Sequence, residues 1–89
     1  MTALISVTPN PFTNVIHIEI DCLDNDINYC VVRLIDKNGK ILKMIGVNVQ
    51  EGSTKISIDR LKVFPKGEYH FDVLTTDGKK IHSMLLTKE

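Results

Sequence analysis

The scarcity of alanine beside an abundance of β-branched residues most constrains the fold of this 89-residue chain. Val, Ile and Thr together account for 26 residues, whereas Ala3 is the single alanine. β-Branched side chains fit the pleated surface of a sheet and lose rotamer freedom in a helix, where alanine is the most favoured residue. The composition therefore predicts an all-β domain.

Turn signals that contain glycine or proline divide the chain into short segments. Asn38-Gly39 and Asp77-Gly78 are the strongest, because a tight hairpin turn requires positive φ angles that Gly, Asn and Asp tolerate best. Residues 51–53 and 65–67 carry further glycine-containing signals. Pro9-Asn10-Pro11 cannot form a central strand, because its two prolines lack an N–H group.

The segments between these turns are predicted to be strands at residues 4–8, 15–22, 29–36, 40–49, 55–58, 68–75 and 80–86. The second segment alternates cleanly between isoleucine and polar residues, which is typical of a half-buried strand. In the sixth segment, Tyr69, Phe71 and Val73 are predicted to face the core, and Asp72 to face solvent.

Short strands at this spacing predict an immunoglobulin-like β-sandwich of about seven antiparallel strands. A single sheet of that many strands would leave one apolar face exposed to water. A chain of 89 residues buries only about 60% of its unfolded surface, so we expect one domain, residues 1–89, with one core. The connection at residues 59–67 is predicted to cross between the two sheets.

The charge balance excludes several classes of partner. Eleven Lys and Arg residues balance eleven Asp and Glu residues, so nothing indicates a nucleic-acid footprint. Lys79, Lys80 and Lys88 are expected on a solvated face. No apolar run approaches 18 residues, so no membrane span is predicted. The first residues do not read as a signal peptide, so the chain is either cytosolic or a piece of a longer secreted protein.

Candidate metal ligands and thiols occur in patterns that favour structural roles. Cys22 and Cys30 are expected to face the core, either as two buried thiols or, in an oxidising compartment, as a disulfide. The spacing of His17, His70 and His82 matches no metal-binding pattern. No cofactor is predicted.

A loop with three oxygen-bearing side chains begins like a calcium-binding loop. Asp24, Asp26 and Asn28 follow the spacing of its first ligands, but Tyr29 stands where such a loop requires glycine, and Ile35 stands where it requires glutamate. We therefore interpret this segment as a polar hairpin loop, with a weak calcium site as the alternative.

The chain contains four distinctive pieces, at residues 9–12, 34–40, 61–69 and 77–88. Their order and spacing resemble those of the C-terminal sorting domain of the type IX secretion system. That family reads as a P-N-P-F opening, an L-Y-D-x-x-G-K hairpin, an L-x-x-G-x-Y strand start and a basic, apolar tail. The resemblance covers about residues 7–89 and departs from the pattern at Thr8, Glu68 and Thr87. The sorting-motif residues that it identifies are Pro9, Asn10, Pro11, Phe12, Asp36, Gly39, Gly67, Tyr69, Gly78, Leu86 and Lys88.

The resemblance implies a non-catalytic address label at the C-terminal end of a longer secreted protein of a Gram-negative bacterium. Its expected partners are the outer-membrane translocation machinery, a sortase that later removes the domain, and an N-terminal cargo domain. The expected localisation is secreted or cell-surface, by way of the periplasm. Pro9 and Pro11 would stiffen the segment that precedes Phe12, which is expected to anchor in the core.

Two other interpretations fit the same predicted fold. One is a generic immunoglobulin-like or fibronectin-type-III-like accessory module that binds glycan or protein in a surface protein. The other, a small enzyme, is disfavoured because no catalytic constellation is visible and little room is expected for a pocket of about 300 Å³. An exposed edge strand could also pair two copies weakly.

Overall fold

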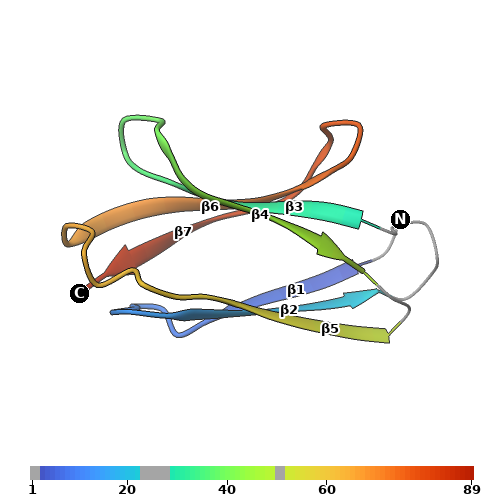
Figure 1. Ribbon diagram of the computed structural model, residues 1–89, viewed down its shortest axis with the longest axis horizontal. Coiled ribbons are helices and arrows are strands. Elements are labelled where there is room, and N and C mark those ends of the chain that lie inside the picture. The colour runs from blue at the N-terminus through green and yellow to red at the C-terminus, as the bar shows by residue number, and fades with distance from the viewer. Residues whose placement is uncertain (1–2, 23–28, 50–51) are drawn as a thin grey trace.

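The structure is a computed structural model that describes residues 3–22, 29–49 and 52–89, and its strands form two facing antiparallel sheets (Figure 1). The strands are β1 (Ala3–Thr8), β2 (Ile16–Cys22), β3 (Tyr29–Ile35), β4 (Ile41–Asn48), β5 (Gly52–Ile58), β6 (Gly67–Thr75) and β7 (Lys80–Lys88). One sheet has the order β1-β2-β5 and the other the order β4-β3-β6-β7. The predicted all-β, immunoglobulin-like sandwich is confirmed, and the described residues form no helix.

Four strands are longer than the sequence predicts, and β1 and β6 each begin one residue earlier than expected, at Ala3 and Gly67. β5 begins at Gly52, because Gly52 pairs with Cys22 across the three-stranded sheet. β7 continues to Lys88, which pairs with Gly67 at the start of β6. Glycine and lysine are weak strand formers, so only the neighbouring strand reveals these ends.

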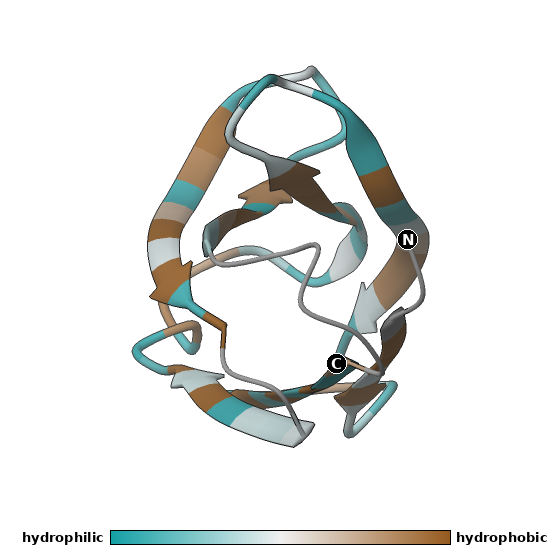
Figure 2. Ribbon diagram, turned by 90° about the vertical axis from the view of Figure 1, so that its right-hand side faces the viewer, coloured by the Kyte–Doolittle hydropathy of each residue, from teal (hydrophilic) through white to brown (hydrophobic). Residues whose placement is uncertain are grey.

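The inward side chains of both sheets form one core, and the alternation along the strands is visible in Figure 2. The predicted inward residues Tyr69, Phe71 and Val73 are buried, as are the alternating isoleucines of β2. Residues outside the strands contribute three further core residues, Phe12, Val49 and Leu61.

The connection after β5 crosses to the other sheet, as predicted, because β5 and β6 belong to different sheets. Asn14 holds this connection in place. The backbone N–H of Leu61 donates to the Asn14 carbonyl oxygen at 2.9 Å, and the N–H of Lys62 donates to Asn14 Oδ1 at 3.2 Å. The buried Leu61 side chain thereby anchors a loop that otherwise lies on the surface.

Cys22 and Cys30 face the core, as the alternation predicts. Within the described structure both are buried thiols rather than a disulfide. Burial raises the pKa of the Cys30 thiol, because a thiolate would lose its hydration there. The two cysteines therefore act as small apolar residues of the core.

Asp72 departs from the predicted pattern, because it lies on the outer face of β6 but is only 2% exposed. Its cross-strand neighbour Arg33 covers it with a bidentate ion pair. Arg33 Nε donates to Asp72 Oδ1 at 2.8 Å, and an η-nitrogen of Arg33 donates to Oδ2 at 2.7 Å. This hydrogen bonding raises the pKa of Arg33, and the pair links β3 to β6.

We expect Asp72→Ala to lower the free energy of unfolding by about 2 kcal/mol, because Arg33 then loses two charge-assisted hydrogen bonds. Urea denaturation of the two proteins measures this difference. Lys80→Ala is the matched control, since Lys80 lies 3.8 Å from Asp72 and its side chain is 54% exposed. An equal effect of the two substitutions would contradict a structural role specific to the Arg33–Asp72 pair.

Candidate functional site

The P-N-P-F segment lies against the last residues of β7. Phe12 N donates to the Thr87 carbonyl oxygen at 2.8 Å, and Glu89 N donates to the Phe12 carbonyl oxygen at 2.9 Å. These bonds form a parallel bridge between Phe12 and Lys88. Residues close to the two ends of the chain are therefore held together by backbone pairing.

The Asn10 side chain extends this pairing toward the middle of β7. Its Oδ1 accepts from Thr87 N at 2.9 Å, and its Nδ2 donates to the Leu85 carbonyl oxygen at 3.4 Å. The peptide bonds before Pro9 and Pro11 are both cis. We call Asn10, Phe12 and residues 85–89 the clasp.

The ring of Tyr69 joins the clasp to the connection before β6. The ring centroids of Phe12 and Tyr69 are 6.0 Å apart in an edge-to-face arrangement, and Phe64 lies 6.4 Å from Tyr69 on centroids. The Tyr69 hydroxyl donates to the Pro65 carbonyl oxygen. Burial raises the pKa of Tyr69, and the negative charge of Asp36 raises it further.

The β3–β4 hairpin is built around Asp36 and Gly39. Asp36 Oδ1 accepts from the backbone N–H groups of Asn38 and Lys40, each at 2.9 Å. Gly39 has a φ of 87°, a conformation that L side chains rarely adopt. The predicted turn role of Gly39 is thereby confirmed, and the Asp36 carboxylate is committed to the backbone of its own turn.

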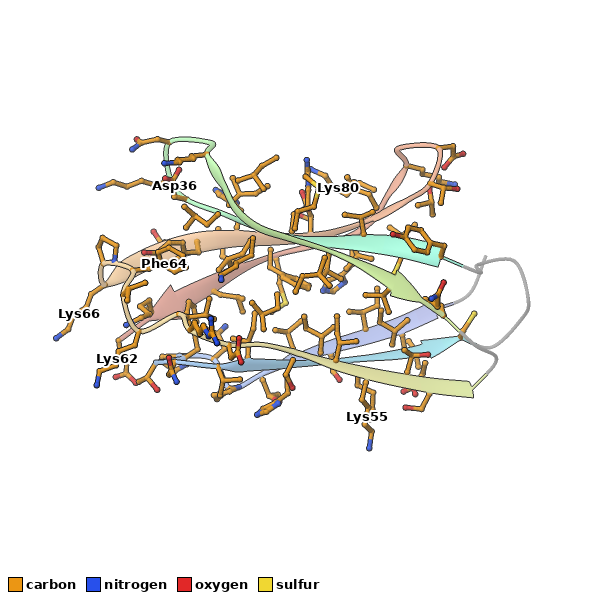
Figure 3. The ribbon with its side chains drawn as sticks, in the orientation of Figure 1. Asp36, Lys55, Lys62, Phe64, Lys66 and Lys80 are labelled. Carbon is orange, nitrogen blue, oxygen red and sulfur yellow. The ribbon has the colours of Figure 1, made fainter. Side chains whose placement is uncertain are left out.

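A groove of about 500 Å³ separates this hairpin from the segment that leads into β6. Its apolar lining comes from Leu42, Phe64 and Tyr69. Charged groups on its lips are Asp36 and Lys37 on the hairpin side, and Lys66 and Glu68 on the β6 side. Figure 3 places Asp36, Phe64 and Lys66 at the same end of the sandwich.

The structure brings all of the predicted sorting-motif residues to this end, with one exception. The exception is Gly78, which lies in the β6–β7 hairpin at the opposite end (Figure 1). Its φ of 87° and its N–H bond to the Thr75 carbonyl oxygen give it the predicted turn role. Gly67 also has the predicted positive φ, 141°.

Lys88 does not lie on a solvated face as expected, because only 6% of it is exposed. Its stem is buried, and its Nζ donates to the Glu89 carbonyl oxygen at 3.0 Å. The sequence analysis also missed Asn14 and Phe64. An asparagine between Phe12 and β2, and an aromatic residue directly before the Pro65 turn, are the signals that could have indicated them.

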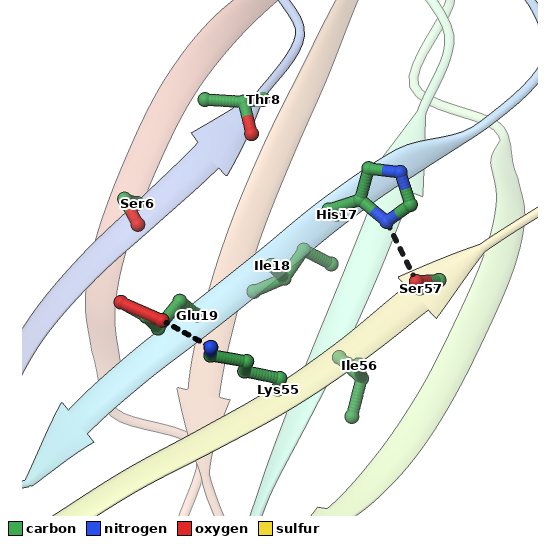
Figure 4. Close-up of a pocket in the computed structure, with 8 residues that line it drawn as sticks. All are labelled: Ser6, Thr8, His17, Ile18, Glu19, Lys55, Ile56 and Ser57. Carbon is green, nitrogen blue, oxygen red and sulfur yellow. Dashed lines mark hydrogen bonds and ion pairs between the residues drawn. The ribbon is translucent and has the colours of Figure 1, made fainter.

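A second hollow, of about 600 Å³, lies on the outer face of the three-stranded sheet (Figure 4). Both hollows are larger than about 300 Å³, so the expectation that the sandwich has little room for a pocket of that size was wrong. His17 Nδ1 and Ser57 Oγ are 2.8 Å apart there, while Glu19 contacts Lys55 at 3.5 Å. The carboxylate in this hollow, Glu19, pairs with Lys55 and not with His17. The contacts drawn in Figure 4 therefore show no carboxylate that orients His17 as a general base.

No group of three or more His, Cys, Asp or Glu side chains within the described ranges could hold a metal ion. The calcium-like segment of Asp24, Asp26 and Asn28 lies outside the described residues. The described part of the chain also contains no helix long and apolar enough to cross a membrane.

Comparison with known protein families decides the identity of the domain. The family described as secretion system C-terminal sorting domain matches residues 6–87. The chain belongs to this family. No curated protein matches the chain in sequence.

Membership in the sorting-domain family establishes the class of process. This is a type IX secretion C-terminal sorting domain, so it accompanies a cargo that is secreted or displayed on the cell surface. The predicted resemblance is thereby confirmed. The match includes the whole P-N-P-F segment and Leu86 but ends one residue before Lys88.

We expect Asn10→Ala to loosen the clasp, because the substitution removes both side-chain hydrogen bonds to β7. The free energy of unfolding should fall by about 1 kcal/mol, and the Thr87 amide should exchange faster. Asn10→Asp is the matched control, since it keeps the Oδ1 acceptor for Thr87 N. Equal Thr87 exchange in the alanine variant and the unmodified domain would contradict this role.

Proposed function

We propose that the clasp end of the sandwich is the surface that the outer-membrane translocation machinery recognises. The domain acts as a non-catalytic address label for a cargo joined ahead of β1. A sortase then removes it. Family membership supports the process, and the gathering of the motif residues around the clasp supports the location of the surface.

The observation that carries this proposal is the backbone pairing of Phe12 with β7. A tail that ended in a free strand would sample many conformations, and ordering it on binding would cost affinity. The bonds from Phe12 N to Thr87 and from Glu89 N to Phe12 hold the tail in one position before any partner arrives. The clasp thus presents the tail residues as a preorganised surface.

The geometry also separates the proposed surface from the cargo. Ala3, at the start of β1, pairs with Cys22, whereas Thr8, next to the clasp segment, pairs with His17. β1 therefore starts at one end of the sandwich and leads to the clasp end. A cargo domain ahead of β1 would leave the clasp end accessible.

An export assay tests this function in a bacterium with an active type IX system. A periplasm-directed fluorescent reporter is fused to residues 1–89, and a second fusion lacks residues 85–89. We expect the complete fusion to reach the surface or medium, and the shortened one to stay in the periplasm. Retention of the complete, folded fusion would contradict the proposal that residues 1–89 act as an export signal.

A substitution pair separates recognition from folding in the same assay. Leu85 and Thr87 are exposed on the tail, so Leu85→Glu with Thr87→Glu alters the surface while the backbone pairing remains. Ser53→Glu with Thr76→Glu adds the same charge at exposed positions away from the clasp. Export should fall with the tail pair and persist with the control pair. Equal export of the two would contradict recognition at the tail.

A further inference from the structure

Among the described residues, the outer edge of β4 has no strand partner, and the register shift against β3 leaves a bulge at Leu42. β4 is the last strand of its sheet and pairs with β3 on one side. Ile41 and Met44 on this strand are 41% and 58% exposed. Unpaired backbone groups beside exposed apolar side chains offer a template for an additional strand.

The groove lies at the start of this open edge. Leu42, the second residue of β4, forms part of the groove lining together with Phe64 and Tyr69. An extended segment that pairs with β4 would therefore reach the groove with one of its side chains. Main-chain bonds along an edge with a side-chain pocket at its end are the two components of recognition by strand addition.

The charges on β4 and on the turn that precedes it indicate the chemistry of the added strand. Lys37, Lys40 and Lys43 follow one another at every third residue, and residues 37–49 contain no acidic residue. Lys66 adds a positive charge on the opposite lip of the groove, where Glu68 is the acidic neighbour. Asp36 is already committed to the backbone of its turn.

This charge pattern disfavours a second copy as the occupant. A second β4 edge contains no acidic residue and would bring no carboxylate to these lysines. We propose instead that β4 accepts an extended acidic segment of the secretion machinery, with an apolar side chain inserted between Leu42 and Phe64. This inference rests on the proposed function, because it specifies the chemistry of the partner that binds at the end of the sandwich where the motif residues lie.

A peptide titration tests the edge directly. The probe is a nine-residue peptide of alternating Val and Glu, added to isotope-labelled residues 1–89 and followed by backbone amide NMR. We expect saturable shifts at β4 and at the groove residues, weakened at least tenfold when NaCl rises from about 50 to about 500 mM. A peptide of alternating Val and Lys should bind at least tenfold more weakly. Chemical-shift changes confined to other parts of the domain, or changes that do not saturate, would overturn the proposal.

Charge reversal links the edge to export. Lys40→Glu with Lys43→Glu should weaken peptide binding and reporter export at least tenfold, whereas Lys55→Glu with Lys79→Glu should change both less than twofold. Lys55 and Lys79 are exposed and lie away from β4. If the unmodified fusion is exported and the Lys40/Lys43 variant is exported equally, the edge proposal fails and the sorting function stands. If the unmodified fusion is not exported, the sorting function fails. The peptide titration alone then tests whether β4 accepts an acidic strand.

Discussion

The pairing of Phe12 with the end of β7 is the interaction on which the functional end of this domain depends. Two backbone hydrogen bonds, at 2.8 and 2.9 Å, tie a segment that follows β1 to the last residues of the last strand. The Phe12 ring then reaches Tyr69, and Tyr69 in turn lies beside Phe64. Pieces that are far apart in sequence thereby become one surface, with the tail held in place.

Much of the fold could be predicted from local patterns. The isoleucine alternation of β2 and the Asn38-Gly39 and Asp77-Gly78 turns each carry their own physical signal, because one strand face or one positive φ depends on few residues. Seven such strands in a short chain leave a two-sheet sandwich as the arrangement that buries the apolar faces. The motif residues were also predictable, but only as separate pieces along the chain.

What the sequence could not show depends on contacts between distant residues. Asp72 occupies an outward position, and only the register of β3 against β6 places Arg33 over it. Lys88 reads as a solvated lysine, but in the fold it forms a backbone bridge to Phe12 and only 6% of it is exposed. The same holds for the clasp, since Asn10 and Thr87 are 77 positions apart and no local pattern indicates their hydrogen bond.

Amide hydrogen exchange at Phe12 and Glu89 tests the central claim most directly. Both N–H groups donate across the clasp, so exchange in the folded domain should be slowed at least tenfold relative to the exposed turn amides of Lys37 and Thr76. Deletion of residues 1–12 should bring the Glu89 amide to the rate of those turns. Glu89 exchange that is already fast in the complete domain would contradict a preorganised tail, and with it the account of how this end is presented to the secretion machinery.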